Sequence, residues 1–134
     1  MTAMDELLHR AANNQIITAA DLPYPANAVF NPGAARVGEE TLLLLRVEDL
    51  RGISLLQVAR SRDGATGWRF DAEPLLRPEA EHPEEIWGCE DPRLTWLAER
   101  GEWAIASTAY SRRGICLINS SFLASLSNCI VSCA

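Results

Sequence analysis

The pattern of apolar and polar residues predicts a chain built almost entirely of short β-strands. Residues 42–45 are four consecutive leucines, which is typical of a strand buried on both faces. No helix of normal length is predicted after residue 15, and turn residues recur about every ten positions. The main body is therefore expected to be all-β, with the strand spacing of a sandwich or a propeller. Strands are predicted at 41–47, 53–59, 68–70, 93–98 and 103–110.

The two ends of the chain differ from this body. Apolar residues recur at helical spacing over 3–13, which predicts a short N-terminal helix or arm over residues 1–13. At the other end, residues 114–134 carry no charge, whereas the 12 basic and 18 acidic residues all lie in 1–113. We therefore predict one folded domain over 14–113. We interpret 114–134 as an uncharged tail that is not native to the fold, such as a frameshift or an early stop would produce.

Composition narrows the classes of partner. The net charge of −6 and the pI near 4.9 argue against a nucleic-acid-binding face and offer no polybasic segment to a membrane. The tail is too polar for a membrane span, and the first residues lack the apolar core of a secretory signal, so a cytoplasmic location is expected. His9 and His82 lie far in sequence from Cys129 and Cys133, so no metal site and no cofactor are predicted.

A turn motif lies between two of the predicted strands, at residues 61–68. Asp63 is expected to accept backbone N–H groups, Gly64 to take a positive φ, and Trp68 to cover the turn. This serine-x-aspartate-glycine pattern followed by tryptophan resembles the Asp-box turns of β-propeller blades.

Candidate chemistry concentrates at residues 87–95. Pro92 fixes its own φ and is expected to push Asp91 toward extended geometry, while Arg93 offers five donors to a carboxylate or a sugar oxygen. A rigid backbone around a carboxyl group is what a general acid requires. The alternative interpretation is a structural Asp-Pro turn in which Arg93 is a solvated ion-pair partner. An Asn-Pro-Gly turn is predicted at 31–33, and a charged cluster follows the leucine strand at 46–49.

Taken in order, these motifs resemble glycoside hydrolase family 130, the mannoside phosphorylases and related mannosidases. The resemblance covers residues 14–113 and implies a five-bladed β-propeller with its active site in the central channel, of which this chain would hold about two blades at ~40–50 residues each. The motifs that carry it are residues 31–35, 43–49, 59–64 with Trp68, 88–93 and 108–111.

The resemblance also implies roles for individual residues. Asp91 would be the catalytic acid that protonates the glycosidic oxygen. Asn31, Arg46 and Asp49 would hold the sugar of a β-mannoside oligosaccharide, and Arg93 would line the subsite or buttress Asp91. In phosphorolysis, inorganic phosphate is the co-substrate and nucleophile, so one carboxylic acid is enough.

Glu90 is interpreted as a structural partner of the acid. Adjacent strand residues point to opposite faces, so Glu90 and Asp91 are not expected to form the facing carboxylate pair of inverting hydrolysis, about 6.5–9.5 Å apart. Cys89 is interpreted as a small buried hydrophobic residue rather than a catalytic thiol.

The chain lacks features that the resemblance would lead one to expect. The family's phosphate-binding basic residues lie downstream, whereas this chain has no basic residue after Arg113, and at least about three repeats are usually needed for stability. The expectation is an N-terminal part of an enzyme that cleaves β-mannosides, inactive alone. Phosphorolysis and hydrolysis both stay open. The alternatives are a non-catalytic sugar-binding module and a plain all-β interaction domain. A homo-oligomer would cover the open sheet edges.

Overall fold

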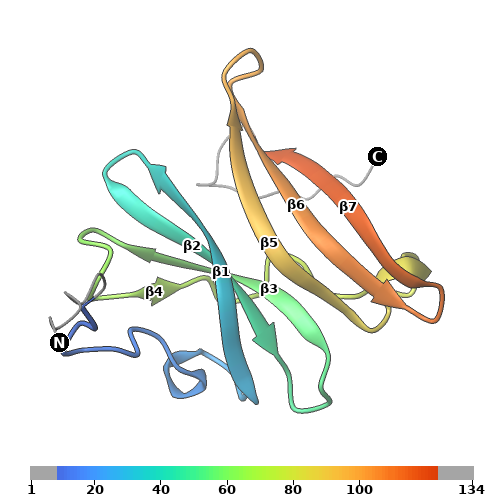
Figure 1. The fold of residues 1–134 in the computed structure, drawn as a ribbon, viewed down its shortest axis with the longest axis horizontal. Coiled ribbons are helices and arrows are strands. Elements are labelled where there is room, and N and C mark those ends of the chain that lie inside the picture. Colours follow the sequence, from blue (N-terminus) through green and yellow to red (C-terminus); the bar gives the residue numbers. More distant parts are fainter. Residues whose placement is uncertain (1–8, 124–134) are drawn as a thin grey trace, which may run out of the picture.

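The computed structural model describes residues 9–123, which form one seven-stranded sheet with almost no helix (Figure 1). The predicted all-β class is confirmed. None of the helices in this part of the chain is long and apolar enough to cross a membrane. The strands are β1 (Ala28–Val37), β2 (Glu40–Glu48), β3 (Ser54–Ser61), β4 (Arg69–Phe70), β5 (Gly88–Leu97), β6 (Glu102–Ser111) and β7 (Gly114–Leu123), and the 3-10 turns are η1 (Ala19–Asp21) and η2 (Pro83–Glu85).

The sheet consists of two antiparallel groups joined by a single rung. Its order is β1-β2-β3-β5-β6-β7, with β4 paired to β3. The pairing of β3 with β5 is parallel and consists of Ser54 opposite Gly88. Figure 1 shows the two groups, β1–β4 and β5–β7, diverging from this junction. Because the sheet is continuous and open, the five-bladed arrangement stays a prediction.

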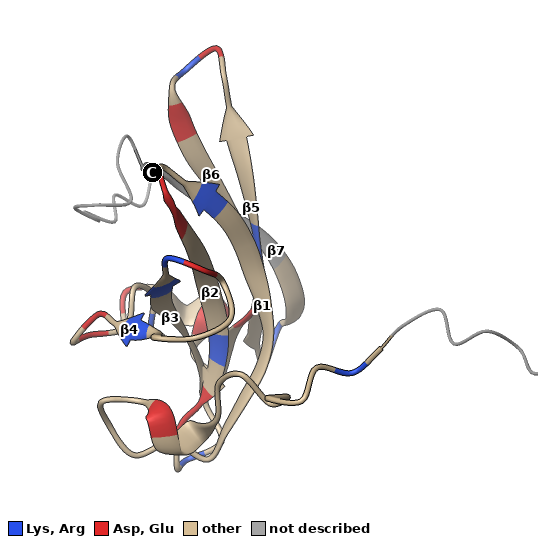
Figure 2. Ribbon diagram, turned by 90° about the vertical axis from the view of Figure 1, so that its left-hand side faces the viewer, with Lys and Arg blue, Asp and Glu red and all other residues tan. Residues whose placement is uncertain are grey.

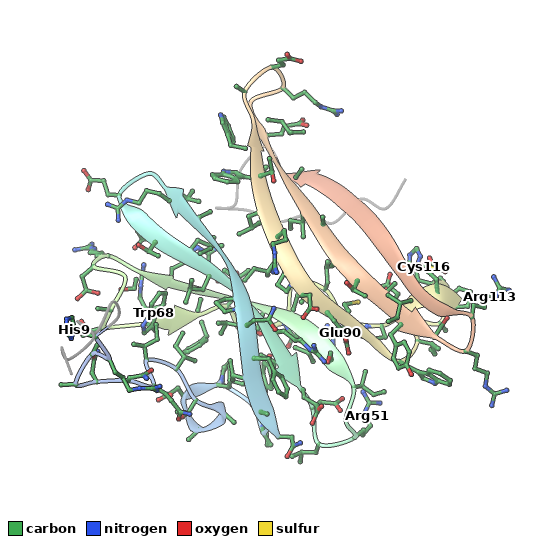
Figure 3. The ribbon with its side chains drawn as sticks, viewed as in Figure 1. His9, Arg51, Trp68, Glu90, Arg113 and Cys116 are labelled. Carbon is green, nitrogen blue, oxygen red and sulfur yellow. The ribbon has the colours of Figure 1, made fainter. Side chains whose placement is uncertain are left out.

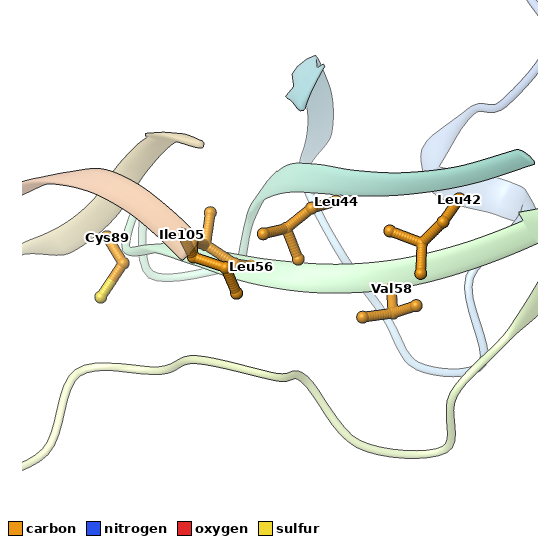
Figure 4. Packing of buried hydrophobic residues seen from close by; sticks show 6 residues of the cluster. All are labelled: Leu42, Leu44, Leu56, Val58, Cys89 and Ile105. Atoms are coloured by element: carbon orange, nitrogen blue, oxygen red, sulfur yellow. The ribbon is translucent and has the colours of Figure 1, made fainter. Parts of the chain in front are cut away.

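Strands β2 and β3 are buried on both faces, as the run of leucines predicts. One face places four of their side chains against Cys89 and Ile105 of the second group (Figure 4). The other face packs under the segment that precedes β1 and under Trp68. Burying a leucine side chain contributes about 1.5–3 kcal/mol, so these two strands carry most of the core. The first face holds Leu42, Leu44, Leu56 and Val58, and the second holds Leu43, Leu45, Val47, Leu55 and Ala59.

The two ends of the described chain bear differently on the sequence predictions. Of the helix or arm predicted over 1–13, residues 9–13 form no helix, and residues 1–8 lie outside the described part. Residues 114–123 form β7, which pairs with β6, so the sheet continues past the boundary predicted after residue 113. The backbone ladder of a strand requires no charged side chain, which is why the loss of charge did not mark the end of the sheet. Residues 124–134 of the predicted tail lie outside the described part.

Two prolines lie inside strands where the sequence suggested turns or strand starts. The predicted turn at 31–33 is wrong, because β1 runs through it, and β5 begins at Gly88, upstream of the predicted start at residue 93. Pro32 is tolerated because β1 is an edge strand, and Pro92 because it lies where the pairing of β5 with β6 is irregular.

The predicted aspartate turn forms between β3 and β4. Oδ1 of Asp63 accepts hydrogen bonds from the backbone N–H groups of Ala65 at 2.9 Å and Thr66 at 2.8 Å, and Oδ2 accepts from the Thr66 hydroxyl at 2.6 Å. Gly64 has φ +72°, as expected, and its N–H donates to the Ser61 hydroxyl at 3.1 Å. The turn is therefore held by a carboxylate that acts only as an acceptor.

Asp63 should make the stability of the domain sensitive to acid. The Thr66 hydroxyl, followed by the Thr66 and Ala65 N–H groups, holds the pKa of the Asp63 carboxyl well below its usual range. A lowered pKa contributes stability that is present above the unfolded value, about 3.9, and is lost as pH falls through the folded value. At pH 7, we expect Asp63→Asn to have a lower melting temperature than wild type. On acidification, its melting temperature should fall less than that of wild type. Thermal melts at neutral and at acidic pH measure both effects.

The control is Glu99→Gln, at an exposed position in the turn that follows β5. Its melting curves should follow wild type at every pH. An Asp63→Asn variant with the acid dependence of wild type would contradict the role assigned to this carboxylate.

Candidate active site

The candidate site lies where β1 and β2 meet β5, and two of these strands are irregular there. The pairing of β1 with β2 shifts register between Val29 and Pro32, and that of β5 with β6 shifts between Glu90 and Arg93. Such β-bulges turn side chains away from the regular alternation and are common beside active sites. The two irregular stretches contain Asn31 and Asp91, two of the residues singled out in the sequence.

Gly33 lets β1 approach β5 closely, although the two strands are not neighbours in the sheet order. A Cβ atom at Gly33 would lie 2.9 Å from the carbonyl oxygen of Pro92 and 3.2 Å from its carbonyl carbon. Only glycine fits such a contact with backbone. Since Pro92 is fully buried, this contact fixes the β5 bulge against β1.

Arg46, near the end of β2, joins three other side chains of the site. Its Nη1 donates to Oδ1 of Asp91 at 3.2 Å, its Nη2 lies 2.9 Å from Oε1 of Glu90, and its Nε donates to the hydroxyl of Ser54 at 3.1 Å. The planar guanidinium is suited to binding several oxygen acceptors at fixed angles. Arg46 therefore connects the two antiparallel groups of the sheet. Figure 3 shows Glu90 near the centre of the molecule, where the groups meet.

Two residues that sequence reasoning missed complete this arrangement. Ser54, only 2% exposed, donates to Oε1 of Glu90 at 3.3 Å, and the ring of Phe30 lies under the Arg46 guanidinium with its centroid 5.0 Å from Cζ. Two sequence signals could have identified these residues. Ser54 is a polar residue at the start of an apolar strand, and Phe30 is an aromatic residue beside Asn31. Phe30 is 42% exposed, so part of its surface is open to a ligand.

The expectation that Glu90 and Asp91 point to opposite faces is wrong, because both carboxylates meet the same guanidinium. Asp91 is also not extended: its φ is +47°, in the left-handed region. The bulge breaks the alternation of a regular strand at this residue. Strained backbone of this kind typically costs about 1–3 kcal/mol and is concentrated at functional sites.

Asp49 is not brought to Arg46. It lies in the turn between β2 and β3, where its Oδ1 accepts from the backbone N–H groups of Arg51 at 2.8 Å and Ile53 at 3.1 Å. Partial burial acts to raise the pKa of Asp49, but the hydrogen bonds from Arg51 and Ile53 together hold that pKa below its usual value. The structure therefore gives Asp49 a clear part in holding this turn.

Arg93 and Asn31 lie at the same crossing, but among the described residues neither side chain forms a hydrogen bond or ion pair with Asp91. The Arg93 side chain is turned back so that Nη1 donates to the carbonyl oxygen of Pro92 at 2.9 Å. It is Arg46 that buttresses Asp91. Asn31 is exposed, and its side chain makes no hydrogen bond to another described residue, which leaves its amide open to solvent.

The site combines two partly buried side chains, those of Arg46 and Glu90, with the more exposed carboxylate of Asp91. The side chains of Arg46 and Glu90 are 21% and 23% exposed, whereas that of Asp91 is 48% exposed. In Figure 2, acidic and basic residues are interspersed over the strands and loops around this crossing. Charged donors, carboxylate acceptors and an exposed aromatic ring are the groups that bind the hydroxyls and the C–H face of a sugar.

No protein-family model and no curated protein matches this chain. Several solved structures do. A "putative glycoside hydrolase" from Parabacteroides distasonis is 21% identical with a TM-score of 0.75, covering 92% of this chain and 40% of its own. A glycosyl hydrolase from Bacteroides ovatus is 23% identical with a TM-score of 0.75, covering 91% of this chain and 40% of its own.

A "putative glycosidase" from Bacteroides thetaiotaomicron matches a shorter stretch, with 26% identity, a TM-score of 0.61, and coverage of 72% of this chain and 29% of its own. This chain thus spans two fifths or less of the length of these structures. The likeness establishes a glycoside-hydrolase-like fold.

Proposed function

We propose that this chain forms one part of the sugar-binding site of a carbohydrate-active enzyme that cleaves β-mannosides, with Asp91 as the general acid. The observation that carries the proposal is the convergence of Asp91 and Glu90 on Arg46, at two β-bulges, in a glycoside-hydrolase-like fold. The assignment to family 130 rests on the motifs of the sequence, whereas the fold supports only the broader class of glycoside-hydrolase-like proteins.

In the proposed reaction, Asp91 gives its proton to the glycosidic oxygen as the bond to the anomeric carbon breaks. The bonding electron pair passes to the leaving oxygen, and inorganic phosphate attacks the anomeric carbon from the opposite side, with inversion, to give a sugar 1-phosphate. In hydrolysis, water attacks instead and gives up one proton to a general base. Arg46 contacts Oδ1 of Asp91, which leaves Oδ2 to carry the proton. Glu90 and Ser54 hold Arg46 in place, so they are positioning residues.

The sugar would be bound by groups around this acid. The exposed ring of Phe30 offers a surface to the C–H face of the sugar, while Arg46 and the amide of Asn31 supply hydrogen-bond donors. Arg93 would lie at the rim. Phosphorolysis needs only one carboxylic acid, but the phosphate-binding residues of the family have no counterpart in this chain. We therefore expect this chain alone to bind sugar without turnover.

This expectation is tested by titrating the chain with a β-mannoside disaccharide, followed by NMR chemical shifts. Arg46→Ala should weaken binding by about tenfold or more, because a charge-assisted hydrogen bond is worth roughly 1.5–3 kcal/mol. Asp91→Asn keeps the shape of the side chain and should still bind. Arg100→Ala, in the exposed turn after β5, is the control and should leave the affinity unchanged.

The alternatives give different results. Phosphate-dependent release of mannose 1-phosphate by this chain would contradict the lack of turnover. If Arg46→Ala and Asp91→Asn leave every sugar interaction untouched, the chain is a plain interaction domain and the Asp-Pro-Arg sequence is structural. If the coding DNA after codon 110 shows no further propeller-like strands in any frame, a sugar-binding module becomes the better interpretation.

A further inference from the structure

The segment before β5 gathers three potential metal ligands that the proposed sugar site does not use. His82 directly precedes the short 3-10 turn η2, and Glu84 and Glu85 belong to it. The ligand atoms of the three side chains all lie within 4.8 Å of one another, and Nδ1 of His82 is 3.4 Å from Oε1 of Glu84. An imidazole nitrogen with carboxylate oxygens is a ligand set typical of zinc.

Glu85 provides an independent reason to expect a cation. Its side chain lies in the interior, in a residue only 9% exposed, and the ion pairs found among the described residues do not include it. Its Oε2 accepts a hydrogen bond from the buried thiol of Cys89 at 2.5 Å. A thiol is a weak donor, and a buried carboxylate without a cation is costly. A divalent ion at Oε1 would supply the missing charge, with Cys89 orienting the carboxylate from behind.

A cavity of about 370 Å³ gives access to two of these ligands. His82 and Glu85 form part of its wall, beside Leu75 and Leu76. Arg77 and Glu79 also line it, and Arg77 is paired with Glu73. The side chains of His82 and Glu84 are 33% and 38% exposed, so a hydrated ion can reach them. Two partly exposed ligands, one buried ligand and an open approach suit a zinc site with three protein ligands and one bound water.

We propose that His82, Glu84 and Glu85 bind a zinc-type divalent cation. Calcium fits less well, because it prefers six to eight oxygen ligands. The bound ion would join His82 to η2, and the hydrogen bond from Cys89 to Glu85 connects this segment to the start of β5, the strand that also holds Glu90 and Asp91. Sequence reasoning missed the set because its spacing matches no recognised zinc pattern and because the burial of Glu85 is visible only in the fold.

The test titrates Zn²⁺ into the full chain by calorimetry, in a background in which Cys116, Cys129 and Cys133 are serine. This background removes other thiols that bind zinc. We expect one equivalent bound and a higher melting temperature in its presence. His82→Asn should weaken binding by about tenfold or more, and Glu85→Gln similarly.

Two matched controls separate this site from adventitious binding. His9→Asn removes the other histidine, and Glu79→Gln removes a carboxylate from the same cavity wall; both should bind as the background does. Arg46→Ala should also leave zinc affinity unchanged, so failure of the sugar proposal would not affect this result. The proposal is overturned if the chain, folded by circular dichroism, binds no zinc, or if His82→Asn, at a partly exposed position, binds it as tightly as the background.

Discussion

Leu44→Ala should lower the free energy of unfolding by about 3 kcal/mol, within the 2–5 kcal/mol range for buried leucines. Leu44 has 0% exposure and lies in the cluster in which β2 and β3 pack against Cys89 and Ile105. The truncation therefore removes contacts within the first group of strands and opens a cavity at the junction with the second. A domain of this size is stable by only about 5–15 kcal/mol, so the loss is a large fraction of the total.

The measurement is urea unfolding followed by circular dichroism or tryptophan fluorescence. The control is Leu50→Ala, a leucine in the β2–β3 turn that is 72% exposed, for which the change should stay within about 0.5 kcal/mol. Equal effects of the two substitutions would mean that the cluster around Leu44 is not the core of this protein.

Gly33→Ala should destabilise the protein by about 1–3 kcal/mol and also weaken sugar binding. The new Cβ would lie 2.9 Å from the carbonyl oxygen of Pro92, and neither partner is a flexible side chain that could move aside. The strands β1 and β5 must then separate. Separation moves the bulge that carries Asp91 away from the one that carries Asn31, so stability and binding should fall together.

Ala34→Val is the matched control, because Ala34 is the exposed neighbour of Gly33 on the same strand. It adds more bulk than Gly33→Ala, yet both the urea midpoint and the sugar affinity should stay close to wild type. If Gly33→Ala were as stable as wild type and bound sugar equally, the close contact of β1 with β5 would have no functional importance.

The regular parts of the fold could be predicted from the sequence because they depend on local pattern. Four successive leucines at 42–45 indicate burial on both faces, and the aspartate turn follows from Asp63 and Gly64 alone. The β7 pairing was missed, because an uncharged segment gives no periodic signal that separates a strand from a tail. Of the helix or arm predicted over 1–13, residues 9–13 show no helix, since apolar spacing over so short a segment does not secure one.

The site was only half predictable for a different reason. The motifs identified Arg46, Glu90 and Asp91, but their contact depends on bulges that bring residues 46 and 91 together across the sheet. The regular alternation of side chains along a strand predicted opposite faces for Glu90 and Asp91, whereas both carboxylates meet Arg46. The family resemblance grouped Asp49 with the sugar-binding residues, whereas its hydrogen bonds hold a turn.

The single rung between β3 and β5 also bears on the order in which the protein assembles. Strands within each group pair through short hairpins, whereas the rung from Ser54 to Gly88 must close a much longer loop, at a greater entropic cost. Folding should therefore complete the two groups first and join them last. Arg46 and Ser54 come from one group, Glu90 and Asp91 from the other. The site is thus created by the final step, and a ligand bridging the two groups would slow their separation.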